Sequence, residues 1–334
     1  KIQSEKTRSF YDNPDYRILF DRLDGNVLLE KYADCYQGVV TGDTNRFIYY
    51  FWEIPYIDNS KWMKYRKAPT ENDEGLNSVI KWECGKGELH KYAEETRHRL
   101  HDMHESGKLS WNKKGVAIGR ISRKVVPYYG EIYDNSVAVV TPKMNNDLSS
   151  IFSFTQSEDF QHQLTVLDQK LSITNATILK VGYDKKQWTN RNIFPSSFSN
   201  DCTQWVFHGN PSKSVDPLQV AVVRLLGYRW PAELDDKMEL SDEARNLVAQ
   251  SRSLLPYADK NGIVCIPSVR GEEPASERLL NLLAAAYKDE DINMILAELL
   301  SNADHAGKSL ETWLRDKFFT QHYKLFGHRP FIWQ

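Results

Sequence analysis

The pattern of hydrophobic and polar positions changes near residue 200. Before it, β-branched and aromatic residues form short runs bounded by Gly, Pro, Asn and Asp, and this pattern predicts strands. We expect the strands within residues 38–55, 115–122, 136–142 and 171–183. Apolar residues at helical spacing predict two helices among them, at 88–105 and 157–168.

Beyond residue 215 the helical period dominates. Pro217 directly after Asp216, with Gly227 at the far end, predicts a helix that Asp216 caps. Further helices are predicted at 242–255, 277–287, 292–300 and 309–326, and a short strand at 262–267 is expected to pair with 331–333. The Ser-, Asn- and Pro-rich stretch 190–215 is the predicted junction. The expected fold is therefore α+β, with a sheet-rich domain that has a few helices, followed by a mainly helical C-terminal subdomain.

Composition narrows the class of protein. A chain of 334 residues with 41% hydrophobic content suits a soluble protein of two domains. Its apolar runs fall far short of the roughly 18 residues that a membrane span needs, so a membrane protein is excluded. The four cysteines lie far apart without a Cys-x-x-Cys pair, which favours a reducing cytoplasm over a disulfide framework or zinc ribbon. Because it begins at Lys1 and closes on an apolar run, we expect the chain to be cut from a longer protein.

Charge is informative only locally. The net charge of -2 argues against a uniformly basic nucleic-acid binder. Basic residues nevertheless gather in three places: at 61–67 among aromatic residues, between 108 and 143, and at 185–191 beside Trp188. Each cluster is either a solvated face or a surface for a polyanion.

Motifs for catalysis are incomplete in this chain. Asn13-Pro14-Asp15-Tyr16 is similar to the Asn-Pro-Pro-aromatic motif that holds a target amine, but it lacks the second Pro and no Gly-rich cofactor turn accompanies it, so we interpret it as a turn. Four histidines between His90 and His104 lie near Cys84 without metal-ligand spacing, and we interpret them as surface histidines. Neither a serine-hydrolase elbow nor a phosphate-binding loop is present. We therefore expect no catalytic residue and no metal site.

A more specific motif begins at Gly38. It runs Gly-Val-Val-Thr-Gly-Asp-Thr-Asn-Arg-Phe to Phe47, and Phe51-Trp52-Glu53 follows. This segment resembles the opening of the target-recognition region in large class I adenine-specific DNA methyltransferases, the enzymes of type II restriction-modification and BREX-like phage-defence systems. Further stretches resemble the same family, at 111–115, 171–177, 224–231, 262–272 and 328–333, so that the resemblance covers most of residues 30–334.

The resemblance implies a division of the chain. Residues 1–30 would be a connector from a missing methyltransferase domain, 31–200 the target-recognition domain, and 201–334 a truncated helical region. S-adenosylmethionine would bind in the missing upstream domain, with no cofactor in this chain. The implied partners are double-stranded DNA, the methyltransferase domain of the same parent chain, and restriction or defence-system subunits.

Such an enzyme flips its adenine out of the duplex, so a separate module must select the site by phosphate and base contacts. The residues of the recognition loop are Thr41, Gly42, Asp43, Asn45 and Arg46. Outside the loop, the candidates for contact with bases are Asn112, Arg120, Arg123, Gln187 and Asn190. In the major groove, Arg side chains pair with guanine, and Asn or Gln side chains pair with adenine. The candidates for DNA contact are Lys61, Lys64, Arg66, Asn112, Lys113, Lys114, Arg120, Arg123, Lys124, Lys185, Lys186 and Arg191.

Three alternatives remain open. The recognition loop is equally well explained as a structural turn in which Gly42 takes a positive φ and Asp43 and Asn45 bond the backbone. The chain's nine Trp and 17 Tyr also suit a carbohydrate- or protein-binding module, although we expect Trp205, Trp230 and Trp313 to be core residues. A hydrolase whose site is scattered along the sequence is the third alternative.

Overall fold

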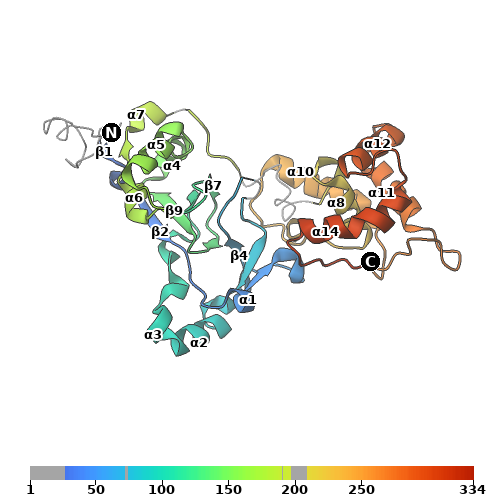
Figure 1. Cartoon of the computed structure of the whole chain (residues 1–334), viewed down its shortest axis with the longest axis horizontal. Helices are drawn as coiled ribbons and strands as arrows, with labels where there is room; N and C mark the ends of the chain where they lie inside the picture. The colour runs from blue at the N-terminus through green and yellow to red at the C-terminus, as the bar shows by residue number, and fades with distance from the viewer. Residues whose placement is uncertain (1–26, 72–73, 190, 197–208) are drawn as a thin grey trace, which may run out of the picture. The chain divides into compact units, whose positions relative to one another are not determined.

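The computed structural model describes residues 27–71, 74–189, 191–196 and 209–334. Its contacts divide the chain into two compact units, residues 1–197 (unit 1) and 198–334 (unit 2) (Figure 1). The Asn13-Pro14-Asp15-Tyr16 segment, Asn190 and Trp205 lie outside the described residues. The fold is α+β, because helices and small sheets build unit 1, while residues 209–334 form helices and loops without a strand. None of the described helices is long and apolar enough to cross a membrane.

The first sheet of unit 1 is antiparallel throughout and has the strand order β2-β9-β6-β7. Every residue of β6 is buried, which explains its uninterrupted apolar run. The predicted strands at 115–122 and 136–142 correspond to β6 and β9. The four strands are β2 (Ala33–Gln37), β6 (Gly115–Gly119), β7 (Val125–Tyr128) and β9 (Val137–Pro142).

Helices pack against this sheet through one shared core. Phe154 and Phe160 from the helices lie in the same buried cluster as Ile118 of β6 and Val140 of β9. The predicted helix at 157–168 is confirmed, because the hydroxyl of Ser157 accepts a hydrogen bond from Phe160 N and caps α5. The helices are α4 (Leu148–Thr155), α5 (Glu158–Leu167), α6 (Asn175–Leu179) and α7 (Lys185–Trp188).

The strand predicted at 171–183 is wrong over most of its length. The Thr174 hydroxyl accepts a hydrogen bond from Thr177 N and starts α6 at a position where the β-branched residues favour a strand. Only β10 (Gly182–Tyr183) is a strand, and it pairs with β1 (Val27–Leu28). A local cap therefore overrides the strand propensity here.

The second sheet has the order β3-β5-β4-β8, and its strands are shorter than predicted. The 38–55 run contributes only β3 in this sheet, because the Asp43 carboxylate accepts from Arg46 N and turns the chain into the short helix α1 (Thr44–Phe47). β8 pairs in parallel with β4 and leads directly into β9 of the first sheet. The strands are β3 (Ile48–Tyr50), β4 (Trp62–Arg66), β5 (Ser78–Lys81) and β8 (Ile132–Tyr133).

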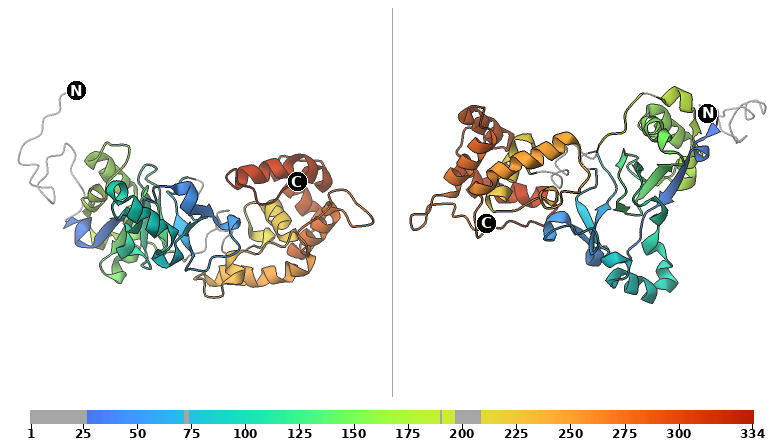
Figure 2. Two further views of the ribbon diagram at one scale, coloured as in Figure 1. Left: turned by 90° about the horizontal axis from the view of Figure 1, so that it is seen from below. Right: turned by 180° about the vertical axis from the view of Figure 1, so that it is seen from behind.

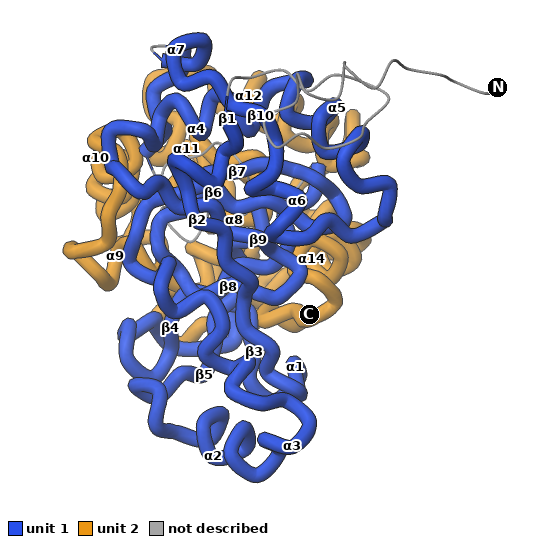
Figure 3. The backbone as a smooth tube through the Cα atoms, turned by 90° about the vertical axis from the view of Figure 1, so that its left-hand side faces the viewer, with its two compact units in different colours: residues 1–197 blue, residues 198–334 orange. Residues whose placement is uncertain are grey.

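The helix predicted at 88–105 is broken into pieces. It consists of α2 (Glu88–Glu95), α3 (Arg97–Leu100) and a 3-10 turn at Met103–Glu105. His101 has a φ of 50°, a left-handed conformation that ends α3. Figure 3 shows α2 and α3 at one end of unit 1 and α4 and α7 at the other.

Unit 2 is helical, and the yellow-to-red part of the chain in Figure 2 shows its described residues as helices and loops. Pro217 stands at the first position of α8, as predicted, although the Asp216 side chain makes no capping bond. The predicted helix at 309–326 contains a π-helical segment, Leu314–Phe318. The α-helices are α8 (Pro217–Leu225), α9 (Pro231–Leu234), α10 (Asp242–Ser251), α11 (Ala275–Ala286), α12 (Ile292–Asn302), α13 (Leu310–Trp313) and α14 (Phe319–Leu325).

The strand predicted at 262–267 is absent from the described fold. The Asp259 carboxylate accepts hydrogen bonds from the backbone N–H groups of Asn261 and Ile263, which closes a turn where the strand was expected. Residues 331–333, the expected partner of this strand, do not form a strand either, because Phe331 packs into an aromatic cluster with Tyr228 and Phe326.

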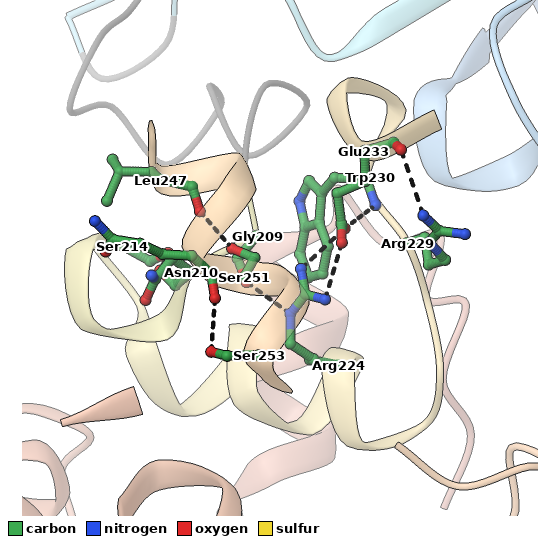
Figure 4. Close-up of polar contacts among 11 residues, drawn as sticks. Gly209, Asn210, Ser214, Arg224, Arg229, Trp230, Glu233, Leu247, Ser251 and Ser253 are labelled. Carbon is green, nitrogen blue, oxygen red and sulfur yellow. Dashed lines mark hydrogen bonds and ion pairs between the residues drawn. The ribbon is translucent and has the colours of Figure 1, made fainter. Parts of the chain in front are cut away.

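A buried ion pair organises the start of unit 2 (Figure 4). The Arg224 guanidinium donates to both carboxylate oxygens of Glu233, at 3.1 and 2.9 Å, and to the carbonyl of Gly209 at 2.8 Å. Glu233 also accepts from Trp230 N at 2.8 Å, and the guanidinium lies 5.1 Å from the centre of the Trp230 ring. Trp230 and Trp313 are buried, which confirms that both are core residues.

His322 makes the stability of unit 2 depend on pH. It is fully buried, its Nδ1 faces Gln219 Oε1 at 3.2 Å, and its Nε2 accepts from Ile332 N at 3.3 Å. Burial lowers the pKa of His322 to about 4, so the unfolded chain binds a proton near pH 6.5 that the folded chain rejects. We expect the free energy of unfolding to fall by about 2 kcal/mol as pH drops from 6.5 to 4. Urea unfolding of the wild type and of His322→Gln between pH 6.5 and 4 tests this expectation. If the free energy of unfolding depends equally on pH in both proteins, His322 is not the cause.

Candidate nucleic-acid interface

The basic residues within β4 and directly before it differ in exposure. Lys61 is exposed and its ammonium lies 5.6 Å from the centre of the Trp62 ring, and Lys64 is half-buried. Arg66 is fully buried and forms an ion pair with Glu131, while its Nη1 donates to the carbonyl of Glu74 at 2.7 Å. The prediction that Arg66 contacts DNA is therefore wrong, since a buried and paired arginine holds the fold together and offers no charge at the surface.

Arg120 and Arg123 flank the turn between β6 and β7 and tie it to α5, to the segment that follows α5 and to the β8–β9 turn. Arg120 donates to the carbonyls of Ile173 and Asn135, at 3.0 and 3.2 Å. Arg123 donates to Thr165 Oγ1 at 2.8 Å and has a φ of 57°. Both arginines and Lys124 are half-buried. Their first role is structural, and only the remaining N–H groups are available to a ligand.

Asn112, Lys113 and Lys114 lie at the opposite end of β6. Asn112 is exposed in a left-handed conformation, with a φ of 60°, and its backbone N–H donates to Gly130 O at 2.9 Å. This bond fixes the loop directly before β6, and both lysines that follow are exposed. The 108–143 region is therefore two separate basic surfaces, because one strand separates the loop from Arg120 and Arg123.

The third cluster lies on and after α7. Lys185 forms an ion pair with the buried carboxylate of Asp147, which raises the pKa of Lys185 and neutralises its charge. Lys186 and Gln187 are exposed, and the Arg191 guanidinium lies 4.5 Å from the centre of the Trp188 ring. Lys186 and Arg191 therefore carry the cluster's remaining positive charge.

Packing brings the second and third clusters to one end of the first sheet. Tyr129, at the end of β7, donates to the carbonyl of Pro195, so the segment after Arg191 passes beside the loop that ends in Gly130. Lys143 follows β9, whose end pairs with the start of β6. We call this surface the basic end; its residues are Lys113, Lys114, Lys143, Lys186 and Arg191. The Lys143 ammonium donates to Glu30 O and lies 3.7 Å from Asp34 Oδ1, so its charge is partly compensated. Within the described ranges, no carboxylate lies at ion-pair distance from Lys113, Lys186 or Arg191.

The recognition loop is built into the other end of unit 1. Thr41 is buried and Gly42 has a φ of 73°, so the backbone requirement expected for this glycine is met. A Cβ at Gly42 would lie 2.4 Å from Leu100 Cδ1 of α3. Asp43 caps α1. Asn45 and Arg46 are exposed. The first half of the loop is structural, and the second half faces solvent.

We expect Gly42→Ala to lower the free energy of unfolding of unit 1 by about 1–3 kcal/mol, because alanine is strained at this φ and its methyl group would crowd Leu100. Thermal unfolding checks it. Gly271→Ala, measured on the unfolding of unit 2, is the control for alanine at a positive φ, since Gly271 has a φ of 82° but nothing lies within 4 Å of its Cβ position. Equal losses in the two variants would show that the contact with Leu100 adds nothing.

Arg46 is held by an ion-pair network from α2. Its Nε donates to Glu88 Oε1 at 2.6 Å, and Lys81 donates to Glu88 Oε2 at 2.6 Å. The hydrogen bond from Lys81 and, to a smaller extent, the one from Arg46 lower the pKa of Glu88. The Arg46 guanidinium also lies 5.3 Å from the centre of the Tyr92 ring. The loop's arginine therefore has a defined position.

Some charged residues near these surfaces were missed by sequence reasoning. Arg97 and Arg99 of α3 are exposed beside the recognition loop, and Arg99 donates to the hydroxyl of Tyr92 at 3.3 Å. Lys143 was counted in the basic region and not proposed as a contact. The signal for all three was a basic residue at a helix or strand end, but the continuous helix predicted at 88–105 concealed α3.

His90 and His104, from the predicted group of four histidines, lie side by side. His104 is buried, so the prediction of surface histidines is wrong for this residue, and its Nε2 lies 3.2 Å from His90 Nδ1. Burial lowers the pKa of His104, because it disfavours the charged ring. No cluster of three metal-ligating side chains occurs in the described part of the chain.

A pocket of unit 2 whose lining includes three carboxylates bears on the hydrolase alternative. It has a volume of about 580 Å³, and its lining includes Asp216, Glu290 and Glu298. Burial raises the pKa of Asp216. Ser212 and Ser214 also line it, but both hydroxyls bond to Asn210. The described lining contains no nucleophile with an adjacent base, so it gives the hydrolase alternative no support.

No family model matches the sequence, and no curated protein matches it. The family resemblance therefore rests on the motifs described above.

Proposed function

We propose that this chain is the DNA-recognition part of a site-specific adenine DNA methyltransferase of restriction-modification or phage defence. It would bind double-stranded DNA in the cytoplasm, with methyl transfer supplied by another domain of the same protein. Restriction or defence-system subunits are the further partners in this proposal. The observation that carries it is the basic end, where exposed cationic residues from three segments of the sequence lie at one end of the first sheet.

The chemistry of the basic end suits phosphates. Lysine ammonium groups attract phosphate at any orientation. The planar guanidinium of Arg191, which lies against the Trp188 ring, presents its N–H donors in one plane. The strands beneath are buried and antiparallel, so the backbone segments that carry these charges start from a fixed sheet. A local gathering of exposed cations on a chain of net charge -2 supports the proposal of a polyanion site.

The two glycines between β2 and α1 do not form a loop for S-adenosylmethionine, the cofactor that the proposed family uses. The glycines between β2 and α1 are the nearest approach to a cofactor loop, but both pack against protein. A Cβ at Gly38 would lie 2.2 Å from Asp134 O, and one at Gly42 would meet Leu100. These glycines serve close packing, so we derive no step of methyl transfer in this chain.

A carbohydrate-binding module is the alternative from another class. Tyr50 and Trp52 stack on each other, with ring centres 4.4 Å apart, and the Lys67 ammonium lies 4.3 Å from the centre of the Tyr50 ring. These rings are occupied by protein partners and present no bare platform for a sugar. These two rings therefore serve internal packing, whereas Tyr56 and Trp333 are 55% and 75% exposed and keep this alternative open to the test below.

Fluorescence anisotropy of a labelled duplex of about 30 base pairs tests the proposal, with a soluble polysaccharide as competitor. We expect the chain to bind the duplex with a Kd of roughly 1–100 µM at physiological salt, and the polysaccharide not to compete. We also expect no methyl transfer from labelled S-adenosylmethionine by this chain alone. Absence of duplex binding, or displacement by the polysaccharide, would overturn the proposal.

A further inference from the structure

Arg46 combines exposure with a fixed position. Its side chain is 44% exposed, although Nε and Nη2 both contact Glu88 Oε1, at 2.6 and 2.5 Å. Its guanidinium also lies against the rings of Phe47 and Tyr92, 5.2 and 5.3 Å from their centres. A surface arginine normally samples many rotamers, so this degree of constraint requires an explanation.

The network behind Arg46 is itself anchored. Glu88 opens α2, and its second oxygen accepts from Lys81 of β5. Asp43 caps α1 and so fixes the backbone of Arg46: the Asp43 carboxylate accepts a hydrogen bond from Arg46 N at 3.2 Å. The backbone of Arg46 is therefore held by a residue three positions before it, and its side chain by a residue 42 positions after it.

The contacts leave one edge of the guanidinium available. Glu88 binds the Nε side, and within the described residues no acceptor bonds Nη1. The Nη1 and Nη2 N–H groups on the far edge form a two-pronged donor. This donor matches the O6 and N7 acceptors that guanine presents in the major groove of DNA, whereas adenine presents a donor in place of O6.

We propose that Arg46 recognises a guanine in the target site and that Glu88 is the positioning residue that aims it. This inference rests on the proposed function and assigns one base of the recognised sequence. A fixed arginine loses little conformational entropy on binding and penalises other bases, which a mobile phosphate-binding lysine does not. The exposed Arg97 and Arg99 on neighbouring α3 supply phosphate contacts around it.

Selection of duplexes from a random library by the whole chain tests this assignment. We expect the selected sites to share an invariant guanine, and Arg46→Ala to reduce the preference for it about ten- to a hundredfold. Arg46→Lys keeps the charge but loses the two-pronged donor, so it should show the same loss even if Arg46→Ala folds poorly. Glu88→Gln should weaken the preference while total duplex affinity changes little.

Arg97→Ala is the matched control, because Arg97 is an exposed arginine of the same surface whose ion pair with Asp102 is also exposed. It should lower affinity without altering the selected sequence. An unchanged guanine preference in Arg46→Lys would overturn the inference, as would duplex binding by the wild-type chain without any selected sequence. The second outcome leaves the proposed function standing, whereas failure to bind any duplex would remove both.

Discussion

Replacing Lys113, Lys114 and Lys186 together with glutamine is expected to weaken duplex binding roughly ten- to a hundredfold at physiological salt. The three lysines are exposed at the basic end, and each released phosphate contact returns condensed counterions to the DNA. The dependence of log K on log salt should become shallower by about 0.9 for each lost contact. Anisotropy titrations at several salt concentrations measure both quantities.

A second triple variant separates position from net charge. Lys91, Lys170 and Lys180 are equally exposed lysines of unit 1 that lie on other segments, so their replacement with glutamine removes the same charge. We expect this variant to bind the duplex almost as the wild type does. Equal losses in the two variants would show that only overall charge matters and that the basic end is no specific surface.

The largest effect on stability is expected for Glu233→Ala. It would leave Arg224 buried without its partner, and the Trp230 N–H without an acceptor. Removing one partner of a buried ion pair costs about 3–5 kcal/mol, so unit 2 should unfold at much lower urea concentration. Urea denaturation followed by tryptophan fluorescence measures the loss.

The control is Asp236→Ala in the same unit. Asp236 and Arg252 form an ion pair at 3.5 Å whose side chains are 85% and 59% exposed, and such pairs contribute little. Its urea midpoint should match that of the wild type. A similar midpoint for Glu233→Ala would mean that the Arg224 network does not stabilise unit 2.

Local signals in the sequence predicted the helices better than the strands. Ser157 and Pro217 mark helix starts within a few residues, and α5 and α8 begin there. The strand predicted at 171–183 failed because the Thr174 cap outweighs the β-branched residues around it. Short apolar runs are ambiguous between helix and strand, and only tertiary packing decides between them.

The candidate interface was predictable as a list of residues but not as a surface. Sequence reasoning selected Lys113, Lys114 and Lys186, all of which are exposed. It could not foresee that Arg66 is buried, because its partner Glu131 lies 65 positions away and reaches it only through the β4–β8 pairing. Nor could it separate Arg120 from Lys113, which lie at opposite ends of one strand.

The salt dependence of duplex binding by the intact chain tests the central claim most directly. If the basic end holds DNA phosphates, log K must fall linearly with log salt, with a slope of about -3 to -5 for a surface of this charge. A slope near zero, with binding retained at high salt, would contradict the account of this chain as a DNA-recognition module.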